Sequence, residues 1–196
     1  MTGKRLSNKK RQKHARKRPK KIHLRQQLEV IPVKGIIKKM MIVSPEAAYD
    51  ISRLVNGNRK KECGAFLIGN ICIDPKTEMT LVFVNDICTD WKYGSASEYS
   101  FSNELQAMTV NKIRKKYGRS ARVIGTIHSH GTFSAFFSSV DEVMMSMMGP
   151  QMVHMVISPS TSKYVLTMID ANVGHDDGIE LKTIGIEKWF RYTRRN

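Results

Sequence analysis

The chain has 196 residues, a length that suits one domain and is too short for two large ones, and 41% of them are hydrophobic, enough to build a sizeable core. Its three cysteines cannot pair off completely and show no CxxC spacing, which excludes a secreted disulfide framework. No apolar run is long enough to cross a bilayer, and the basic start is not followed by the apolar stretch of a signal peptide. These absences favour a reducing, intracellular setting, cytoplasmic or, in a eukaryote, nuclear.

The excess of positive charge is concentrated at the start of the chain. Of 33 Lys and Arg, set against 17 Asp and Glu, twelve fall in residues 1–25, which hold no acid; the rest of the chain is only +4. With so few apolar groups, residues 1–25 cannot offset the entropy lost on ordering, so we predict a disordered tail.

Such a density of cations would bind phosphate backbones by releasing counterions. We therefore predict contact with RNA or the ribosome through this tail, and a merely solubilising or targeting tail is the alternative. The residues assigned to this nucleic-acid contact are Lys9, Lys10, Arg11, Arg16, Lys17, Arg18, Lys20 and Lys21.

Regular structure is expected after a lead-in over residues 26–37, so we place the folded domain at residues 38–196. A short strand over 40–43 is followed by Ser44-Pro45, a capping serine and a proline typical of a helix start. This helix should run to about residue 55. Strands are then predicted over residues 65–69, 71–73 and 79–84. Cys63 and Cys72 are expected to be buried small apolar residues.

The second half of the domain begins with an amphipathic helix over residues 102–117. Its spacing places Leu105, Met108 and Ile113 inward and Lys112, Arg114, Lys115 and Lys116 outward. A buried strand over 122–127, a helix over 139–148 and strands over 152–157, 163–170 and 179–186 follow. Helices and strands are interleaved without strict βαβ alternation, which indicates an α/β fold with a mixed sheet and helices packed against it.

A His-x-His pair, His128 and His130, follows the apolar strand, and Asp141 comes at the start of the next helix. Residues two apart at a strand end point to the same face, so both imidazoles can reach one metal at about 2.0–2.1 Å. Asp141 can close back as a third ligand. Three protein ligands with an open fourth position are typical of a catalytic zinc site. Local spacing does not supply the base that such a site needs.

The pattern His128-x-His130, seven residues, Ser138, two residues and Asp141 resembles the signature of the JAMM metalloproteases, also called MPN, JAB or Mov34/MPN/PAD domains. The family's upstream Glu stands at the start of a strand, seven residues before a Gly, and Glu62 stands in that relation to Gly69. The resemblance therefore rests on two separate segments, within a fold order from about residue 38 to 190.

This resemblance implies a zinc-dependent hydrolase with one Zn²⁺ per chain, held by His128, His130 and Asp141. Glu62 would take a proton from the attacking water and deliver it to the leaving amine. Ser138 would hydrogen-bond the oxyanion. Family members cut peptide or isopeptide bonds after the C-terminal glycine of ubiquitin or ubiquitin-like proteins, so such conjugates are the expected partners.

One position departs from the family pattern: Gly131 stands where a Pro usually follows the second His. Pro stiffens that loop and Gly permits more backbone freedom. Two alternatives remain beside the enzyme. Glu62 could be a solvated charge next to two lysines, and the domain could be an MPN-fold scaffold or RNA-associated binding protein that acts through its basic tail.

Overall fold

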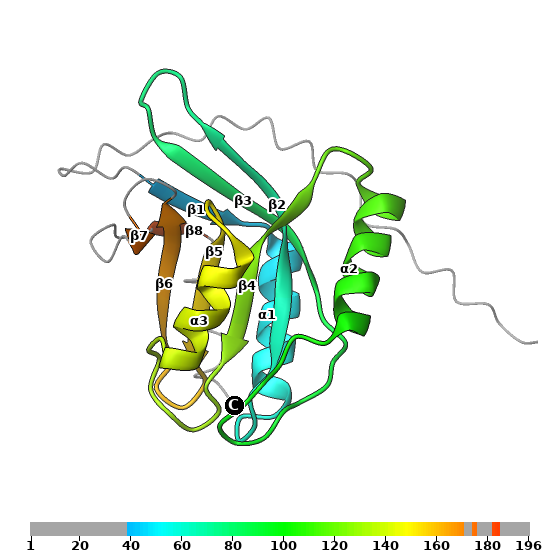
Figure 1. Cartoon of the computed structure of the whole chain (residues 1–196), viewed down its shortest axis with the longest axis vertical. Coiled ribbons are helices and arrows are strands. Elements are labelled where there is room, and N and C mark those ends of the chain that lie inside the picture. The colour runs from blue at the N-terminus through cyan, green and yellow to red at the C-terminus, as the bar shows by residue number, and fades with distance from the viewer. Residues whose placement is uncertain (1–38, 171–173, 176–181, 185–196) are drawn as a thin grey trace, which may run out of the picture. The chain divides into compact units, whose positions relative to one another are not determined.

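The computed structural model describes residues 39–170, 174–175 and 182–184. They form one mixed sheet with three helices (Figure 1). In chain order the elements are β1 (Lys39–Val43), α1 (Pro45–Gly57), β2 (Gly64–Ile73), β3 (Thr80–Cys88), α2 (Asn103–Lys116), β4 (Arg122–Ser129), α3 (Ser139–Met148), β5 (Val153–Ser158), β6 (Lys163–Asp170), β7 (Gly174–His175) and β8 (Lys182–Ile184). The predicted mixed α/β fold is therefore confirmed, and the tail and lead-in over residues 1–37 lie outside the described residues.

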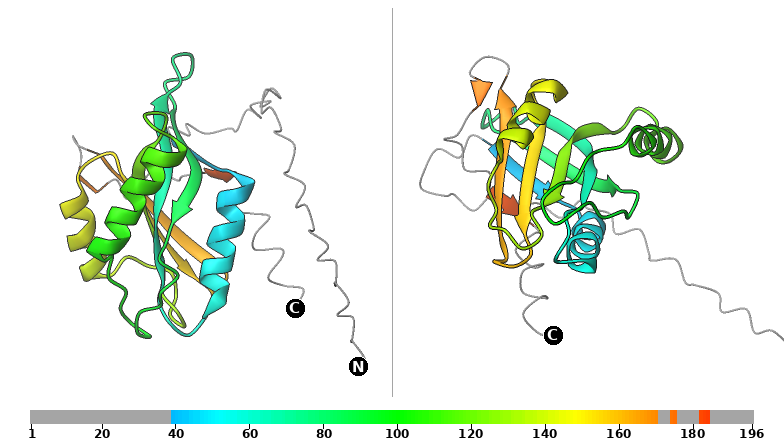
Figure 2. Two further views of the ribbon diagram at one scale, coloured as in Figure 1. Left: turned by 90° about the vertical axis from the view of Figure 1, so that its right-hand side faces the viewer. Right: turned by 60° about the horizontal axis from the view of Figure 1, so that its bottom comes forward.

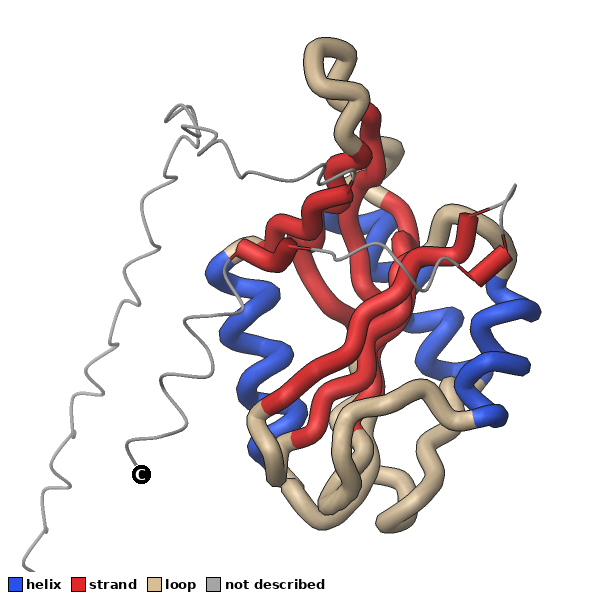
Figure 3. Tube along the Cα trace, turned by 90° about the vertical axis from the view of Figure 1, so that its left-hand side faces the viewer, coloured by secondary structure: helices blue, strands red, loops and turns tan. Residues whose placement is uncertain are grey.

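The strand order is β7-β6-β5-β4-β2-β3-β1-β8. The central strand β2 is antiparallel to both of its neighbours, β3 and β4, whereas β4 and β5 run parallel. This topology brings the end of β4 beside the start of β2, at the lower end of the sheet in Figure 1, and loops gather at that end in Figure 3.

Helices cover both faces of the sheet (Figure 2), and the alternation of side chains along β2 shows how. Ala65 and Leu67 pack in the main core with the buried face of α1, whereas Phe66 and Ile68 pack with Leu105 of α2 on the opposite face. Successive strand residues point to opposite faces, so one strand serves both cores.

Helix α1 begins as its sequence predicts. The Ser44 hydroxyl accepts a hydrogen bond from the Ala47 amide at 3.1 Å, and Pro45 occupies the first turn, where an amide hydrogen would lack a helical partner. The buried residues are Ala47, Ile51, Leu54 and Val55, a spacing that lines one face of the helix. None of the described helices is long and apolar enough to cross a lipid bilayer.

Two details of the predicted burial are wrong. Met108 of α2 is 45% exposed, because this helix buries a narrow line through Leu105 and Thr109. Cys72 is exposed, since the far part of β2 projects beyond the packed core and its last residues are mostly exposed; Cys63 is buried as expected.

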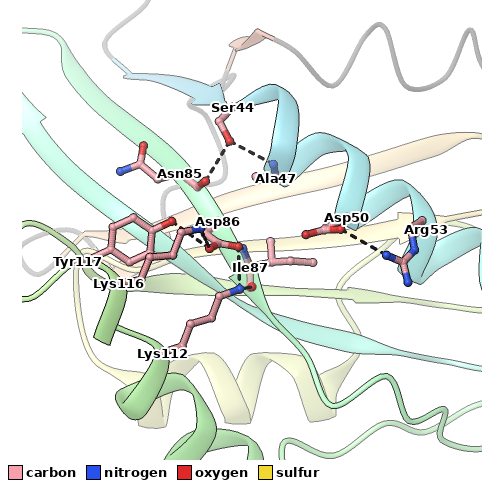
Figure 4. A network of polar contacts seen from close by, with 10 residues as sticks. All are labelled: Ser44, Ala47, Asp50, Arg53, Asn85, Asp86, Ile87, Lys112, Lys116 and Tyr117. Carbon is pink, nitrogen blue, oxygen red and sulfur yellow. Dashed lines mark hydrogen bonds and ion pairs between the residues drawn. The ribbon is translucent and has the colours of Figure 1, made fainter. Parts of the chain in front are cut away.

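Two lysines that were predicted to face outward from α2 also have a partner on the sheet, and one of them, Lys112, is half-buried. The ammonium groups of Lys112 and Lys116 reach the buried carboxylate of Asp86 on β3, at 2.8 and 2.6 Å, and the Tyr117 hydroxyl donates to the same carboxylate at 2.9 Å (Figure 4). Burial raises the pKa of Asp86, but its hydrogen bonds to Lys112 and Lys116 outweigh that effect, so the pKa lies below its ordinary value. This network ties α2 to the sheet.

Candidate metal centre

The two histidines are presented by the end of β4. Pairing with β5 continues past the strand, because the His130 amide donates to the Ile157 carbonyl at 3.0 Å. His128 and His130 therefore share one face, and Ser129 between them points away. The Ser129 hydroxyl accepts from the Cys63 amide at 3.1 Å, which fastens β4 to the start of β2. This contact had no signal in the sequence.

Asp141 reaches the histidines from the first turn of α3. His128 Nε2 lies 3.0 Å from Asp141 Oδ1, and His130 Nε2 lies 3.4 Å from Asp141 Oδ2. All three side chains are buried, and their ligand atoms lie within 4.8 Å of one another. A tetrahedral ion with bonds of about 2.0–2.1 Å would separate its ligand atoms by about 3.3 Å, so the cluster fits a zinc ion.

The hydrogen bonds around the cluster also fit a role as metal ligands. Although His128 Nε2 is close to Asp141, it is buried and has no hydrogen-bond partner in the part of the chain that the structure describes. The two atoms lie 3.0 Å apart without forming a hydrogen bond, an arrangement that an ion bound by both would explain. His130 Nδ1 lies 3.3 Å from the Ser134 carbonyl, which can only accept. A neutral His130 that donates this hydrogen bond from Nδ1 would have the Nε2 lone pair available for a metal ion.

Ser138 lies at the N-cap of α3 and holds Asp141 in place. Its hydroxyl donates to Asp141 Oδ2 at 2.6 Å and accepts from the Asp141 amide at 3.2 Å, and its own amide donates to Oδ2 at 2.7 Å. This is a capping box in which Asp replaces the usual Glu. The contacts turn Oδ1 toward His128. The structure thus gives Ser138 a clear positioning contact, and its predicted oxyanion contact stays a prediction.

Glu62 is placed opposite His130 by the sheet register. Gly64 pairs with His128 in the antiparallel β2–β4 ladder. In an antiparallel pair, the residue two positions before Gly64 lies opposite the residue two positions after His128, which brings Glu62 opposite His130. Glu62 is only 7% exposed, and its backbone is held by Gly94 and Ser95: its amide donates to the Ser95 carbonyl at 2.9 Å, and its carbonyl accepts from the Gly94 amide at 2.8 Å. The solvated-charge alternative for Glu62 is therefore wrong.

The charges in this cluster shift one another's pKa. Burial raises the pKa of Glu62, and the nearby His130 and His128 oppose this only in part. Burial lowers the pKa of His130, but the contact with Asp141 and the charge of Glu62 outweigh it, so the net shift is upward. Burial also raises the pKa of Asp141, yet its His128 and His130 neighbours bring it well below its ordinary value. Asp141 is thus a carboxylate at neutral pH, as a metal ligand must be.

Gly131, the departure from the family pattern, has a structural reason. Its φ is +52°, in the left-handed region that Gly adopts freely and that Pro, fixed near −65°, cannot. A Cβ added there would lie 3.2 Å from the Lys60 carbonyl oxygen and 3.4 Å from that of Ala96. The loop after His130 therefore follows a path that only Gly allows without strain.

The eight tail residues assigned to nucleic acid lie outside the described residues. The structure brings together the other five predicted site residues: His128, His130, Asp141, Glu62 and Ser138. Sequence interpretation missed the residues that hold them, namely Ser129, Ser134, Gly94 and Ser95. These contacts join segments far apart in the chain, or use backbone atoms that any residue has.

A mixed sheet with a His-His-Asp cluster at one strand end and a carboxylate across from it defines the JAB type of α/β domain. The sequence matches the prokaryotic homologs of the JAB domain over residues 46–170, and the chain belongs to that family. No curated protein matches its sequence.

Among solved structures, the chain is similar to the solution structure of protein DSY2949 from Desulfitobacterium hafniense. The TM-score is 0.53 at 19% identity, and the match covers 74% of this chain and 92% of that one. This likeness concerns the fold alone.

Proposed function

We propose that the chain is a zinc-dependent hydrolase that cleaves an amide bond after the C-terminal glycine of ubiquitin or a ubiquitin-like protein. The observation that carries the proposal is the convergence of three buried ligand side chains with a fourth, separately positioned carboxylate, Glu62. The JAB family includes peptidases of this kind, which supports the substrate class. One Zn²⁺ per chain is the expected cofactor.

Zinc bound by His128, His130 and Asp141 would supply a Lewis acid that polarises the scissile carbonyl and acidifies water. The chain's own residues would do the rest. Glu62, with its pKa raised by burial, accepts the proton of the attacking water and passes it to the leaving amine. Ser138 holds Asp141 in its ligating rotamer. The His130 ring is held by the Ser134 carbonyl and by a T-shaped contact with the Phe136 ring, whose centroid is 4.7 Å away.

The first test needs no substrate. Purified protein should contain about one zinc per chain, and His128→Ala and Asp141→Ala should each lose it while Glu62→Gln keeps it. Absence of zinc from folded protein never exposed to a chelator would reject the metal centre and favour the scaffold alternative. Activity is then sought with ubiquitin-like proteins extended by a C-terminal peptide. A Glu62→Gln variant that still cleaved at the wild-type rate would reject the assigned base.

The RNA or ribosome contact of residues 1–25 is a separate proposal that rests on their charge alone. If it holds, deleting residues 1–25 should remove most RNA affinity and most of its salt dependence. Unchanged affinity after the deletion would reject it.

A further inference from the structure

A second pocket lies away from the metal cluster, between α1, the end of β3 and α2, with a volume of about 530 Å³. We call it the α1–α2 pocket. Its chemically distinctive lining residues are Arg53, Trp91, Met108, Asn111, Lys112 and Lys115. This volume falls in the range that small ligands occupy. None of the metal-centre residues lines it, so the proposed hydrolase chemistry gives it no role.

Two of the lining residues form a cation–π contact. The Arg53 guanidinium lies 4.4 Å from the centroid of the Trp91 ring. Trp91 remains 40% exposed, and Met108 beside it is 45% exposed. An exposed indole with a guanidinium against it is a surface on which a further flat, electron-rich ring can stack, as nucleobases do on aromatic rings and on Arg.

The backbone at Trp91 supports a functional use. Its φ is +59°, a conformation that is a true outlier for a bulky residue. Such strain is kept where the surrounding structure fixes it, and it is concentrated at ligand sites. Here the Trp91 amide donates to the Thr89 hydroxyl at 3.1 Å, so a local turn directs the indole into the pocket.

The rim of the pocket is basic. Lys112 and Lys115 extend from α2 and Arg53 from α1; Asp50, 3.9 Å from Arg53, is the one acid among the lining residues. Figure 4 shows the Lys112 ammonium fixed between the Asp86 carboxylate and the Ile87 carbonyl. Lys112 is therefore held at one place on the wall and shares its charge with Asp86, so exposed Lys115 is the cation that can follow a phosphate. Stacking surface and cations together match a base that carries phosphate.

We propose that the α1–α2 pocket binds a nucleotide unit, with the base against Trp91 and Arg53 and the phosphate toward Lys112 and Lys115. The unit could be a free mononucleotide or one residue of a single-stranded RNA, and both present the same chemistry. An acidic peptide could form ion pairs with the lysines but would have no ring to stack on Trp91. A nucleotide can make both kinds of contact, so it matches more of the lining residues.

The test uses the full chain carrying Trp189→Phe, which leaves Trp91 as its single indole. Titration with AMP, and separately with a short oligo(A), should quench Trp91 fluorescence in a saturable way, and Trp91→Ala, followed by calorimetry, should weaken binding by roughly 5- to 100-fold. Saturable quenching by AMP identifies the free nucleotide as sufficient, and quenching by the oligonucleotide alone identifies an RNA strand.

Lys115→Gln and Arg114→Gln form the matched pair. Both remove one charge from an exposed position on α2, but Arg114 does not line the pocket. Lys115→Gln should weaken binding several-fold and Arg114→Gln should not, which also separates the pocket from binding by the basic tail. No quenching by either ligand, equal effects of the two variants, or equal competition by an oligo-glutamate peptide would overturn the proposal.

Discussion

Ser138→Ala separates the positioning role of this serine from the oxyanion role that the family resemblance implies. The substitution removes the 2.6 Å hydrogen bond to the Asp141 carboxylate and the N-cap bond from the Asp141 amide. Loss of a serine N-cap costs about 1 kcal/mol, and loss of a hydrogen bond to a charged group costs about 1.5–3 kcal/mol. Because the Ser138 amide still holds Asp141 at 2.7 Å, we expect a total of about 2–3 kcal/mol.

Ser102→Ala is the matched control. Ser102 caps α2 in the same way, with its hydroxyl accepting from the Leu105 amide at 3.1 Å, and it is far from the metal ligands in the chain. It should lose about 1 kcal/mol, the cost of the cap alone. Denaturant unfolding of metal-free protein should therefore show the larger loss for Ser138→Ala.

Zinc affinity gives the deciding measurement, made by competition with a chromophoric chelator. Residues that orient a ligand side chain typically affect metal affinity by about 10- to 100-fold, so Ser138→Ala should weaken zinc binding by that factor and Ser102→Ala should leave it unchanged. Ser138→Thr, which keeps a capping hydroxyl, should restore most of it. If Ser138→Ala binds zinc as tightly as wild type, the positioning argument is refuted, and only the oxyanion role would remain.

Three further predictions follow from single contacts. Asp86→Asn should cost about 2 kcal/mol at neutral pH. Because the pKa of Asp86 is lowered in the folded protein, its contribution to the free energy of unfolding is complete above the unfolded pKa near 4 and is lost as pH falls through the folded pKa. The difference in unfolding free energy between wild type and Asp86→Asn, measured with urea, should therefore narrow below pH 4. A difference that stayed constant with pH would contradict this. In alkylation at pH 8, exposed Cys72 should react and buried Cys63 should not, because burial raises the pKa of Cys63 to about 11, although Ser129 opposes this. A Cys63 thiol that reacted as fast as Cys72 in native protein, with the sites read by mass spectrometry, would be the contrary result. Gly131→Pro should lower the unfolding midpoint and the zinc affinity by more than Gly131→Ala does. The alanine at φ +52° costs about 1–2 kcal/mol of backbone strain. A Gly131→Pro variant as stable as wild type would show that the loop does not need this positive φ.

The parts of the fold that depend on local rules could be predicted from the sequence. Helix α3 spans Ser139–Met148 as expected, because its Ser cap and the Gly149-Pro150 stop act on neighbouring residues. The start of α1 follows from Ser44 and Pro45 in the same way. Burial at the edges of elements could not be predicted: Met108 has the spacing of a buried residue, but what covers a helix face is decided by other elements.

Strand ends also depended on pairing. The strand predicted over residues 79–84 continues to Cys88 as β3, and the two strands predicted over 65–69 and 71–73 are one, β2, with a register shift between Ile68 and Gly69. A Cβ at Gly69 would lie 1.7 Å from the Phe83 carbonyl oxygen, so the Gly permits a close strand contact rather than ending the strand.

The site, like the fold, has parts that follow from local sequence and parts that depend on contacts between distant segments. His128 and His130 are two residues apart on one strand, and Asp141 follows within one loop, so their shared face could be argued from spacing. Glu62 is 66 residues from His128 and its own neighbours are lysines, so local chemistry predicts a solvated charge. The family resemblance makes it a candidate base, and the antiparallel β2–β4 register, which extends the Gly64–His128 pair to Glu62 and His130, places it at the cluster. A change that shifted this register by one residue would leave all three ligands on β4 and α3 in place and turn Glu62 to the other face of the sheet. Metal binding and catalysis should therefore be separable by mutation, with the first depending on the segment from β4 to α3 and the second also on the loop that holds Glu62.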